Sequence, residues 1–217
     1  MISKSKKIIF FDLDGTLIDT NLAIGLSVQV ALKKIGIRRE LNELFGFEGK
    51  NIETYLEWVL REDKQNNRAK LHICISEYKK IAPRLHLEFS EIEDGLFEIL
   101  EKLDSKANLV IISDKPIGAI TSLLCHFKIL HFFPNIFSSS EIKEPKPSPK
   151  ILIDAIKFLE VKKENCVFVG NTLSDIITGN KAGVNVVLIG SNSINRDELK
   201  DWKYTFKKNL KHFCLDY

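Results

Sequence analysis

The chain has 217 residues, of which 44% are hydrophobic and 28% are charged, and this composition is typical of a globular protein, not a disordered one. Its 32 basic and 29 acidic residues leave a net charge of only +3, which is too weak to argue for binding to nucleic acid or to an anionic membrane. No apolar run approaches the roughly 20 residues that a membrane span needs, and the run Ile8–Phe11, stopped by Asp12, is too short for the core of a signal peptide.

Short apolar runs alternate with helix-like segments along most of the chain. Each run is continuously apolar, as in strands buried on both faces of a parallel sheet. This alternation predicts an α/β fold, a Rossmann-like and doubly wound parallel sheet with helices on both faces. The expected strands are Ile8–Phe11, Leu109–Ile112, Ile136–Phe137, Cys166–Val169, Val186–Ile189 and, with a weaker pattern, Tyr204–Phe206.

Several helix ends are marked by proline, serine or glycine. Pro116 suits the first residue of a helix, and Ser148 suits the cap of a helix whose first turn contains Pro149. Gly183 is a plausible C-terminal cap of the segment SDIITGNKAG. Near the C-terminus, KKNLKHF (207–213) predicts a solvated helix face.

One long segment breaks the alternation. From about Asp19 to Glu88 the sequence shows only helical patterns, in LAIGLSVQVALKKIGI, NIETYLEWVLRED and RAKLHICISEYKKIA. We therefore expect a helical cap domain at 19–88, inserted into a Rossmann-like core formed by residues 1–18 and 89–217.

Polar clusters follow several of the expected strands. DLDGT follows the first strand, SDK the second and GNTLSD the fourth, and KEPKPSP precedes the helix that leads to the fourth. Because ligands bind at the carboxyl ends of the strands in an open parallel sheet, we expect these clusters to converge on one edge. Asp12 and Asp14 repel each other and are costly to bury unless a cation compensates them. The pattern favours a cation site.

In this order the segments resemble the motifs of the haloacid dehalogenase superfamily of phosphohydrolases. DLDGTLIDT matches the first motif throughout, ISDK contains the serine of the second, KPSP the lysine of the third, and VGNTLSDI the frame of the fourth. The helical insert just after the first motif is similar to the phosphoglycolate-phosphatase-like branch. The resemblance covers about Lys7 to Phe213 and implies Mg²⁺-dependent hydrolysis of a small phosphomonoester through an aspartyl-phosphate.

The resemblance also implies catalytic roles for three residues. Asp12 would be the nucleophile that forms the aspartyl-phosphate. Asp14 would protonate the leaving alcohol and then activate water, and dehalogenases lack this second aspartate. Lys146 would neutralise the phosphoryl group and Asp12. Phosphoryl transfer depends mainly on alignment and charge balance, so a dianionic phosphate needs such cations beside a carboxylate.

Further residues would bind the phosphate and the metal. The residues implied at the phosphate are Gly15 and Thr16, which shape the turn, together with Ser113, Asp114 and Lys146. Those implied at the metal are Asp12, Asp14 through its backbone carbonyl, Asn171 and Asp175. Mg²⁺ suits such a set because it prefers carboxylate and carbonyl oxygens.

The sequence departs from the family pattern at two positions. Asn171 stands where the fourth motif usually has aspartate, which removes a negative charge and is expected to weaken metal binding. Asp114 stands where the second motif usually has asparagine, so the formal charge of the two motifs together is unchanged. One hypothesis is a compensating swap in which Asp114 helps to hold a shifted metal. The alternative is drift in a weakened enzyme.

Other functions compatible with these motifs are a pseudo-phosphatase that binds a phosphate ligand with little turnover and a phosphomutase that uses the same intermediate. The expected partner is a small phosphorylated metabolite, with no nucleic acid and no membrane, and the expected assembly is a monomer or homodimer. The four cysteines form no metal spacing and are expected to be reduced and mostly buried, as in a cytoplasmic protein. Lys50 and Arg84 are possible contacts of the cap with an anionic substrate.

Overall fold

The computed structural model describes residues 6–45, 51–62, 67–142, 144–190, 194 and 196–216. The chain folds into two compact units. Residues 1–18 and 92–217 form the core unit, and Asp19–Glu91 form the helical unit.

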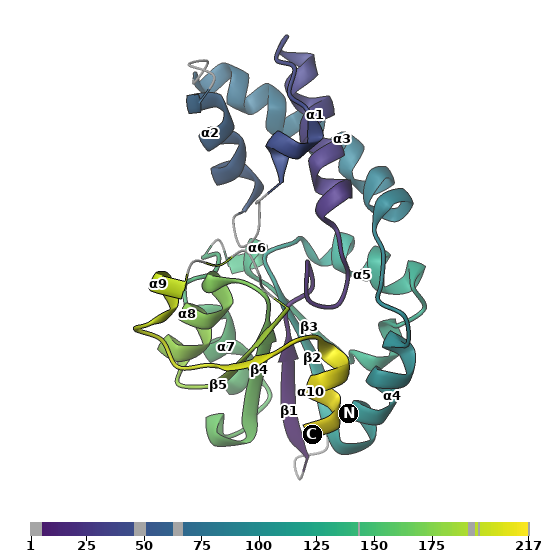
Figure 1. Cartoon of the computed structure of the whole chain (residues 1–217), viewed down its shortest axis with the longest axis vertical. Coiled ribbons are helices and arrows are strands. Elements are labelled where there is room, and N and C mark those ends of the chain that lie inside the picture. Colours follow the sequence, from purple (N-terminus) through teal and green to yellow (C-terminus); the bar gives the residue numbers. More distant parts are fainter. Residues whose placement is uncertain are drawn as a thin grey trace. The chain divides into compact units, whose positions relative to one another are not determined.

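The core unit contains a six-stranded parallel sheet, which confirms the predicted α/β fold (Figure 1). The order of the strands is β3-β2-β1-β4-β5-β6, the order of a doubly wound sheet. All six predicted strands are present; five have slightly wider bounds than the apolar run that predicted them, and the sixth, predicted at Tyr204–Phe206, is shifted by one residue. They are β1 Lys7–Phe11, β2 Ala107–Ser113, β3 Asn135–Ser138, β4 Cys166–Gly170, β5 Asn185–Ile189 and β6 Thr205–Lys207.

Helices cover both faces of this sheet (Figure 1). Ile8 and Phe10 of β1 pack in one hydrophobic cluster with Leu152 of α7 (Lys150–Phe158). Phe11 points to the other face, where its ring meets that of Phe213 in α10 edge-on, with 6.4 Å between the ring centroids. The described helices of the core unit are α4 Leu96–Lys106, α5 Ile117–His126, α6 Ser139–Ile142, α7 Lys150–Phe158, α8 Leu173–Ala182, α9 Arg196–Leu199 and α10 Leu210–Asp216.

The predicted helix ends are close to the observed ones. Gly183 caps α8 in the left-handed conformation, with φ +75°, as expected. Pro116 and Pro149 each occupy the N-cap, one residue before the helix, so the prediction that they lie inside the first turn was wrong by one position. The Ser148 hydroxyl still accepts a hydrogen bond from the backbone N–H of Lys150, over 3.4 Å.

The C-terminal helix is less solvated than predicted. Leu210, Phe213 and Cys214 of α10 are buried, while its lysine and histidine side chains are exposed. The prediction from KKNLKHF was therefore right for the polar side of the helix only. Its apolar side covers the sheet, and Phe213 makes the contact with Phe11.

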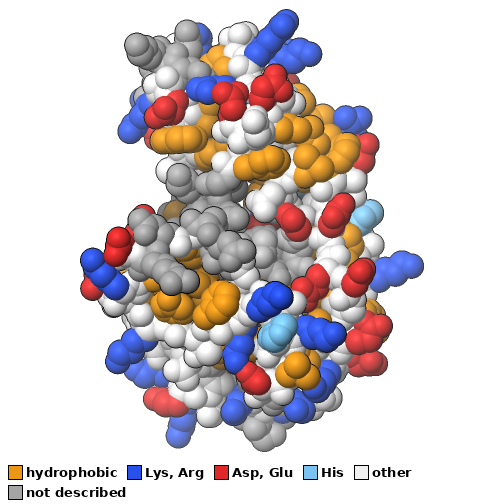
Figure 2. All heavy atoms as spheres, viewed as in Figure 1, with side chains coloured by type: hydrophobic (Ala, Val, Ile, Leu, Met, Phe, Trp, Pro, Cys, Tyr) orange, Lys and Arg blue, Asp and Glu red, His pale blue; other side chains and the backbone are white. Residues whose placement is uncertain are grey.

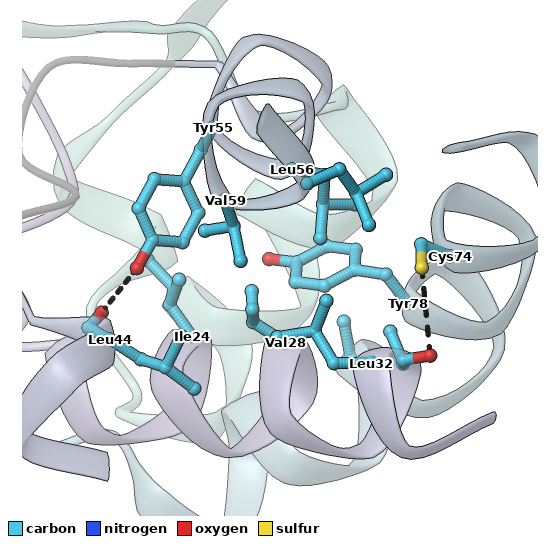
Figure 3. Close-up of a cluster of buried hydrophobic side chains, with 12 residues drawn as sticks. Ile24, Val28, Leu32, Leu44, Tyr55, Leu56, Val59, Cys74 and Tyr78 are labelled. Atoms are coloured by element: carbon cyan, nitrogen blue, oxygen red, sulfur yellow. Dashed lines mark hydrogen bonds between the residues drawn. The ribbon is translucent and has the colours of Figure 1, made fainter. Parts of the chain in front are cut away.

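The helical unit is built from α1 Asn21–Lys34, a 3₁₀ turn at Leu41–Leu44, α2 Ile52–Glu62 and α3 Arg68–Phe89. Its buried side chains form their own core, with Val28 from α1, Leu56 from α2 and Tyr78 from α3 (Figure 3). The Tyr55 hydroxyl donates to the backbone carbonyl of Leu44 over 2.7 Å (Figure 3). The buried hydroxyl is thus satisfied, as a polar group in an apolar core requires.

Helix α3 runs past the predicted pattern, which ended at Ala82, and continues through Pro83 to Phe89. Proline removes one backbone donor and favours a helix end. Here Leu85 and His86, on the far side of Pro83, are both buried, and the Tyr78 hydroxyl and the His86 ring pair over 3.3 Å. Packing of the last turns therefore outweighs the local preference of proline.

Positive and negative side chains are interspersed over the face drawn in Figure 2, as the near-neutral net charge suggests. Across the described residues, no helix is long and apolar enough to cross a bilayer. Cys74, Cys166 and Cys214 are buried free thiols, and Cys125 is an exposed one.

Candidate active site

Three strands bring the candidate residues together at their carboxyl ends. Asp12 follows β1, Ser113 ends β2, and Asn171 follows β4. Strand β1 lies between β2 and β4, and the backbone N–H of Asp12 donates to the Val169 carbonyl over 2.9 Å. In a doubly wound sheet, the point where the strand order reverses is where ligands bind.

Lys146 joins two of the candidate carboxylates. Its Nζ lies 2.5 Å from Asp12 Oδ1 and 2.6 Å from Asp175 Oδ1. The side chains are 5%, 6% and 0% exposed for Lys146, Asp12 and Asp175, so water screens these contacts little. The structure thus brings together residues 134 positions apart in the chain.

The pKa values of this cluster follow from its charges. Burial raises the pKa of Asp12 to about 8, and the carboxylates of Asp175 and Asp14 act in the same direction against the attraction of Lys146. Burial disfavours the charge on Lys146 as well, but the carboxylates of Asp12 and Asp175 outweigh it and raise the pKa of the ammonium. Two ionised carboxylates beside one lysine would leave an excess of negative charge, so the metal-free pocket keeps a proton on Asp12 at neutral pH, and a further cation bound here would take the place of that proton.

Asp175 also determines how α8 begins. Its Oδ2 accepts hydrogen bonds from the Thr172 hydroxyl at 2.7 Å and the Thr172 backbone N–H at 3.0 Å, in a capping box. A Cβ on Gly170 would lie 2.5 Å from the Asp175 carboxyl carbon, so only glycine fits there. Asp175 therefore orients both Lys146 and the turn after β4.

The turn after β1 depends on Gly15. Its φ is +79°, a conformation that glycine adopts without strain, and its N–H donates to the Ile18 carbonyl over 2.7 Å. A Cβ at this position would lie 2.2 Å from Asn171 Nδ2. The Thr16 hydroxyl donates to Asn171 Oδ1 over 3.2 Å. Gly15, Thr16 and Asn171 thus meet at one point, as the motifs predicted.

A lysine that the motif analysis did not single out contacts the second aspartate. Lys115 Nζ lies 3.1 Å from Asp14 Oδ1, with side chains that are 10% and 28% exposed. Lys115 could have been noticed in the sequence from its place in ISDK, directly after the second motif. The Ser113 side chain is buried, and its hydroxyl accepts from the Lys115 backbone N–H over 3.2 Å.

Asp114, which stands where the second motif usually has asparagine, fixes the backbone at Lys146. Its Oδ1 accepts a hydrogen bond from the backbone N–H of Lys146 over 3.1 Å and another from the Ser139 hydroxyl. The bond between Lys146 and Pro147 is cis. Through these hydrogen bonds Asp114 helps to position the backbone of Lys146. Its predicted contacts with phosphate or metal stay predictions.

Residues that carry oxygens suited to a hard cation follow the carboxyl ends of β1 and β4. The Asp12 carboxylate, the Asp14 backbone carbonyl and the Asn171 amide oxygen would form such a set. Among the described residues, no group of three or more His, Cys, Asp and Glu side chains could hold a metal, so a cation here would rely on backbone and amide oxygens too. The raised pKa of Asp12 shows that its negative charge is incompletely compensated in the metal-free site, which fits a cation in this place.

The substrate contacts of the helical unit, Lys50 and Arg84, stay predictions. Lys50 lies outside the described residues, and Arg84 is an exposed residue of α3.

Residues 9–189 match the protein family described as haloacid dehalogenase-like hydrolase. The chain is 27% identical over 182 residues to the 6-phosphogluconate phosphatase of Escherichia coli (strain K12), covering 82% of this chain and 80% of that protein. It is 27% identical over 188 residues to the phosphoglycolate phosphatase of Aquifex aeolicus (strain VF5), covering 84% of each. The crystal structure of a predicted phosphoglycolate phosphatase from Haemophilus somnus 129pt matches with a TM-score of 0.84 at 21% identity, over 97% of both chains. At that identity the likeness shows the fold.

Proposed function

The chain belongs to the haloacid dehalogenase-like hydrolase family, and from that premise we propose that this phosphohydrolase cleaves a small phosphomonoester in a Mg²⁺-dependent reaction through an aspartyl-phosphate. Two relatives named as phosphatases of 6-phosphogluconate and phosphoglycolate support a small phosphorylated metabolite as the substrate. The observation that carries the proposal is the buried contact of Lys146 with Asp12 at the carboxyl end of β1.

Asp12 is the nucleophile in this proposal. Its carboxylate oxygen forms a bond to phosphorus while the bond from phosphorus to the leaving oxygen breaks, and Asp14 gives its proton to that oxygen. Water then attacks the phosphorus, Asp14 takes up a proton from it, and Asp12 is released. Asp14 suits both steps because its side chain is 28% exposed and can reach substrate and water.

Lys146, Asp175 and Ser113 assist in this proposal. Lys146 neutralises charge on Asp12 and on the phosphoryl group, and Asp175 acts through Lys146, whose ammonium it contacts together with Asp12. Ser113 lies buried at the end of β2, where its hydroxyl suits a phosphoryl oxygen. Mg²⁺, held by Asp12, the Asp14 carbonyl and Asn171, would neutralise and align the phosphoryl oxygens.

The helical unit is the proposed cap of the enzyme. It has its own hydrophobic core, so it can move as one body, and such a body can exclude water from a phosphoryl-transfer site. The four free thiols support the proposal of a reducing compartment such as the cytoplasm.

A pseudo-phosphatase is the second candidate. Asn171 favours it, because an amide provides no negative charge where this family usually has a carboxylate. Asn171 Oδ1 also accepts a hydrogen bond from Thr16, which competes with a cation for that oxygen.

Hydrolysis of p-nitrophenyl phosphate, measured with Mg²⁺, Mn²⁺ and Co²⁺ and with a chelator, separates the two candidates. The phosphatase proposal predicts metal-dependent turnover by the wild type and none by Asp12→Asn. If the wild type is inert with every metal while Asn171→Asp is active, the chain is a pseudo-phosphatase. Product analysis on a sugar phosphate shows whether the phosphoryl group passes to water or to a second hydroxyl, as in a phosphomutase.

A further inference from the structure

We propose that Lys115 selects substrates whose leaving group carries a negative charge close to the ester oxygen. This inference rests on the proposed phosphatase reaction and names the substrate class within it. It starts from the contact between Lys115 Nζ and Asp14 Oδ1, which are 3.1 Å apart.

The position of Lys115 is set by its backbone. The N–H of Lys115 donates to the Ser113 hydroxyl over 3.2 Å, and its carbonyl accepts from the Ser138 hydroxyl over 2.7 Å. Pro116 follows directly and restricts the backbone of the residue before it. Lys115 is therefore held in place from the ends of two neighbouring strands, β2 and β3, which a solvated surface lysine would not need.

The leaving group must come next to this ammonium. A general acid has to lie within hydrogen-bond reach of the oxygen it protonates, at about 3 Å. With Asp14 as that acid, the leaving oxygen lies within about 6 Å of Lys115 Nζ if it bonds to Oδ1 and within about 8 Å if it bonds to Oδ2, and an anionic group a few bonds further along the leaving group can reach the ammonium directly. Lys146, by contrast, contacts Asp12 and Asp175, and Asp12 is the residue that receives the phosphoryl group in the proposed reaction.

The charge of Lys115 is well suited to this task. Its side chain is only 10% exposed, and a largely desolvated ammonium binds an anion more strongly than one in water. An ammonium group can donate three hydrogen bonds, so it can contact Asp14 and a second anion at the same time. A carboxylate or phosphate on the leaving group is the chemistry that fits, whereas an uncharged alcohol gains nothing from Lys115.

A matched pair of substrates tests this inference. 2-Phosphoglycolate releases an anionic alcohol, and 2-hydroxyethyl phosphate releases a neutral alcohol of the same length. Values of kcat/KM for both are measured with the wild type, Lys115→Gln and Lys115→Arg, in the metal that supports hydrolysis of p-nitrophenyl phosphate.

We expect the wild type to prefer 2-phosphoglycolate, and Lys115→Gln to lower the ratio of the two kcat/KM values by about 10- to 100-fold, the range for a hydrogen bond to a charged group. Lys115→Arg should restore most of the ratio because it keeps the charge. The ratio is insensitive to partial unfolding, which lowers both values alike.

The inference is overturned if the wild type shows no preference for the anionic substrate, a result that needs no variant. It is also overturned if Lys115→Gln lowers both values equally, since Lys115 would then act only through Asp14. Failure of the proposed function gives a different result, in which the wild type releases no phosphate from either substrate or from p-nitrophenyl phosphate.

Discussion

Removing the carboxylate charge of Asp12 is expected to stabilise the metal-free protein while abolishing its activity. Asp12 and Asp175 share one ammonium, Lys146, in a pocket that is almost closed to water. Asp12→Asn keeps an oxygen that accepts a hydrogen bond from Lys146 and leaves one carboxylate for one lysine. The site would then be electrically balanced without a metal.

The size of the effect follows from the pKa of Asp12, which burial raises from 3.8 to about 8. One pKa unit corresponds to about 1.4 kcal/mol, so the full shift corresponds to between about 5 and 6 kcal/mol. Local relaxation and water entry reduce such energies, and we expect a gain of about 2 to 4 kcal/mol at pH 7.5. For a chain of this length that is a rise in Tm of at least about 4 °C.

The pH dependence has a defined sign. Below pH 3.8 Asp12 is protonated in both the folded and the unfolded state, so the charge no longer distinguishes the wild type from the variant. As pH rises towards 8, the unfolded state releases the proton and the folded state keeps it, which lowers the stability of the wild type. The advantage of Asp12→Asn should therefore be large at pH 7.5 and small at pH 4.5.

Thermal unfolding followed by circular dichroism in a chelating buffer measures this difference. Asp201→Asn, which changes an exposed aspartate of the core unit, is the matched control and should leave Tm unchanged. Added Mg²⁺ should raise the Tm of the wild type more than that of Asp12→Asn. Equal stability of wild type and Asp12→Asn at pH 7.5, or an equal gain at both pH values, would show that the buried charge of Asp12 does not destabilise the metal-free protein.

Substitutions at three further positions have defined outcomes. Asp114→Asn keeps the oxygen that accepts a hydrogen bond from the Lys146 backbone N–H, so kcat/KM should stay within about threefold of the wild type. Asp114→Ala removes that oxygen and should lower kcat/KM by about tenfold or more. Equal losses in the two variants would show that the charge of Asp114 matters, as a metal-holding role requires. Lys146→Met removes the ammonium that Asp12 and Asp175 share and should cost about 3 to 5 kcal/mol of stability at neutral pH, measured by urea unfolding. An unchanged unfolding midpoint would exclude a strong buried ion pair at Lys146. Gly15→Ala meets Asn171 at a positive φ and should lower stability by about 1 to 3 kcal/mol together with activity; full activity would show that the turn adapts.

The sheet was predictable because its strands are apolar on both faces. Ile8–Phe11 and Cys166–Val169 read as continuous apolar runs, and both are central strands. The meeting of Gly15, Thr16 and Asn171 followed from the rule that the carboxyl ends of parallel strands share one edge. Local patterns and one topological rule were sufficient for these features.

Other features depend on contacts between distant residues. Asp114 accepts hydrogen bonds from Ser139 and Lys146, which lie 25 and 32 positions away. A local sequence pattern does not predict partners at such distances. Lys115 looks like any loop lysine until β1 and β2 place it beside Asp14. Helix α3 continues past Pro83 because its last turns bury side chains. Helix propensities of single residues do not include the energy of this packing.

Trapping the phosphorylated Asp12 is the most direct test of the proposed reaction. Enzyme, metal and substrate are mixed, the reaction is quenched in acid within the first turnover, and the phosphoryl group is located by mass spectrometry of peptides. The proposed reaction predicts one phosphoryl group on the peptide that contains Asp12 in the wild type, removable by hydroxylamine, and none in Asp12→Asn. Turnover by the wild type with a phosphoryl group on another residue, or undiminished turnover by Asp12→Asn, would contradict it.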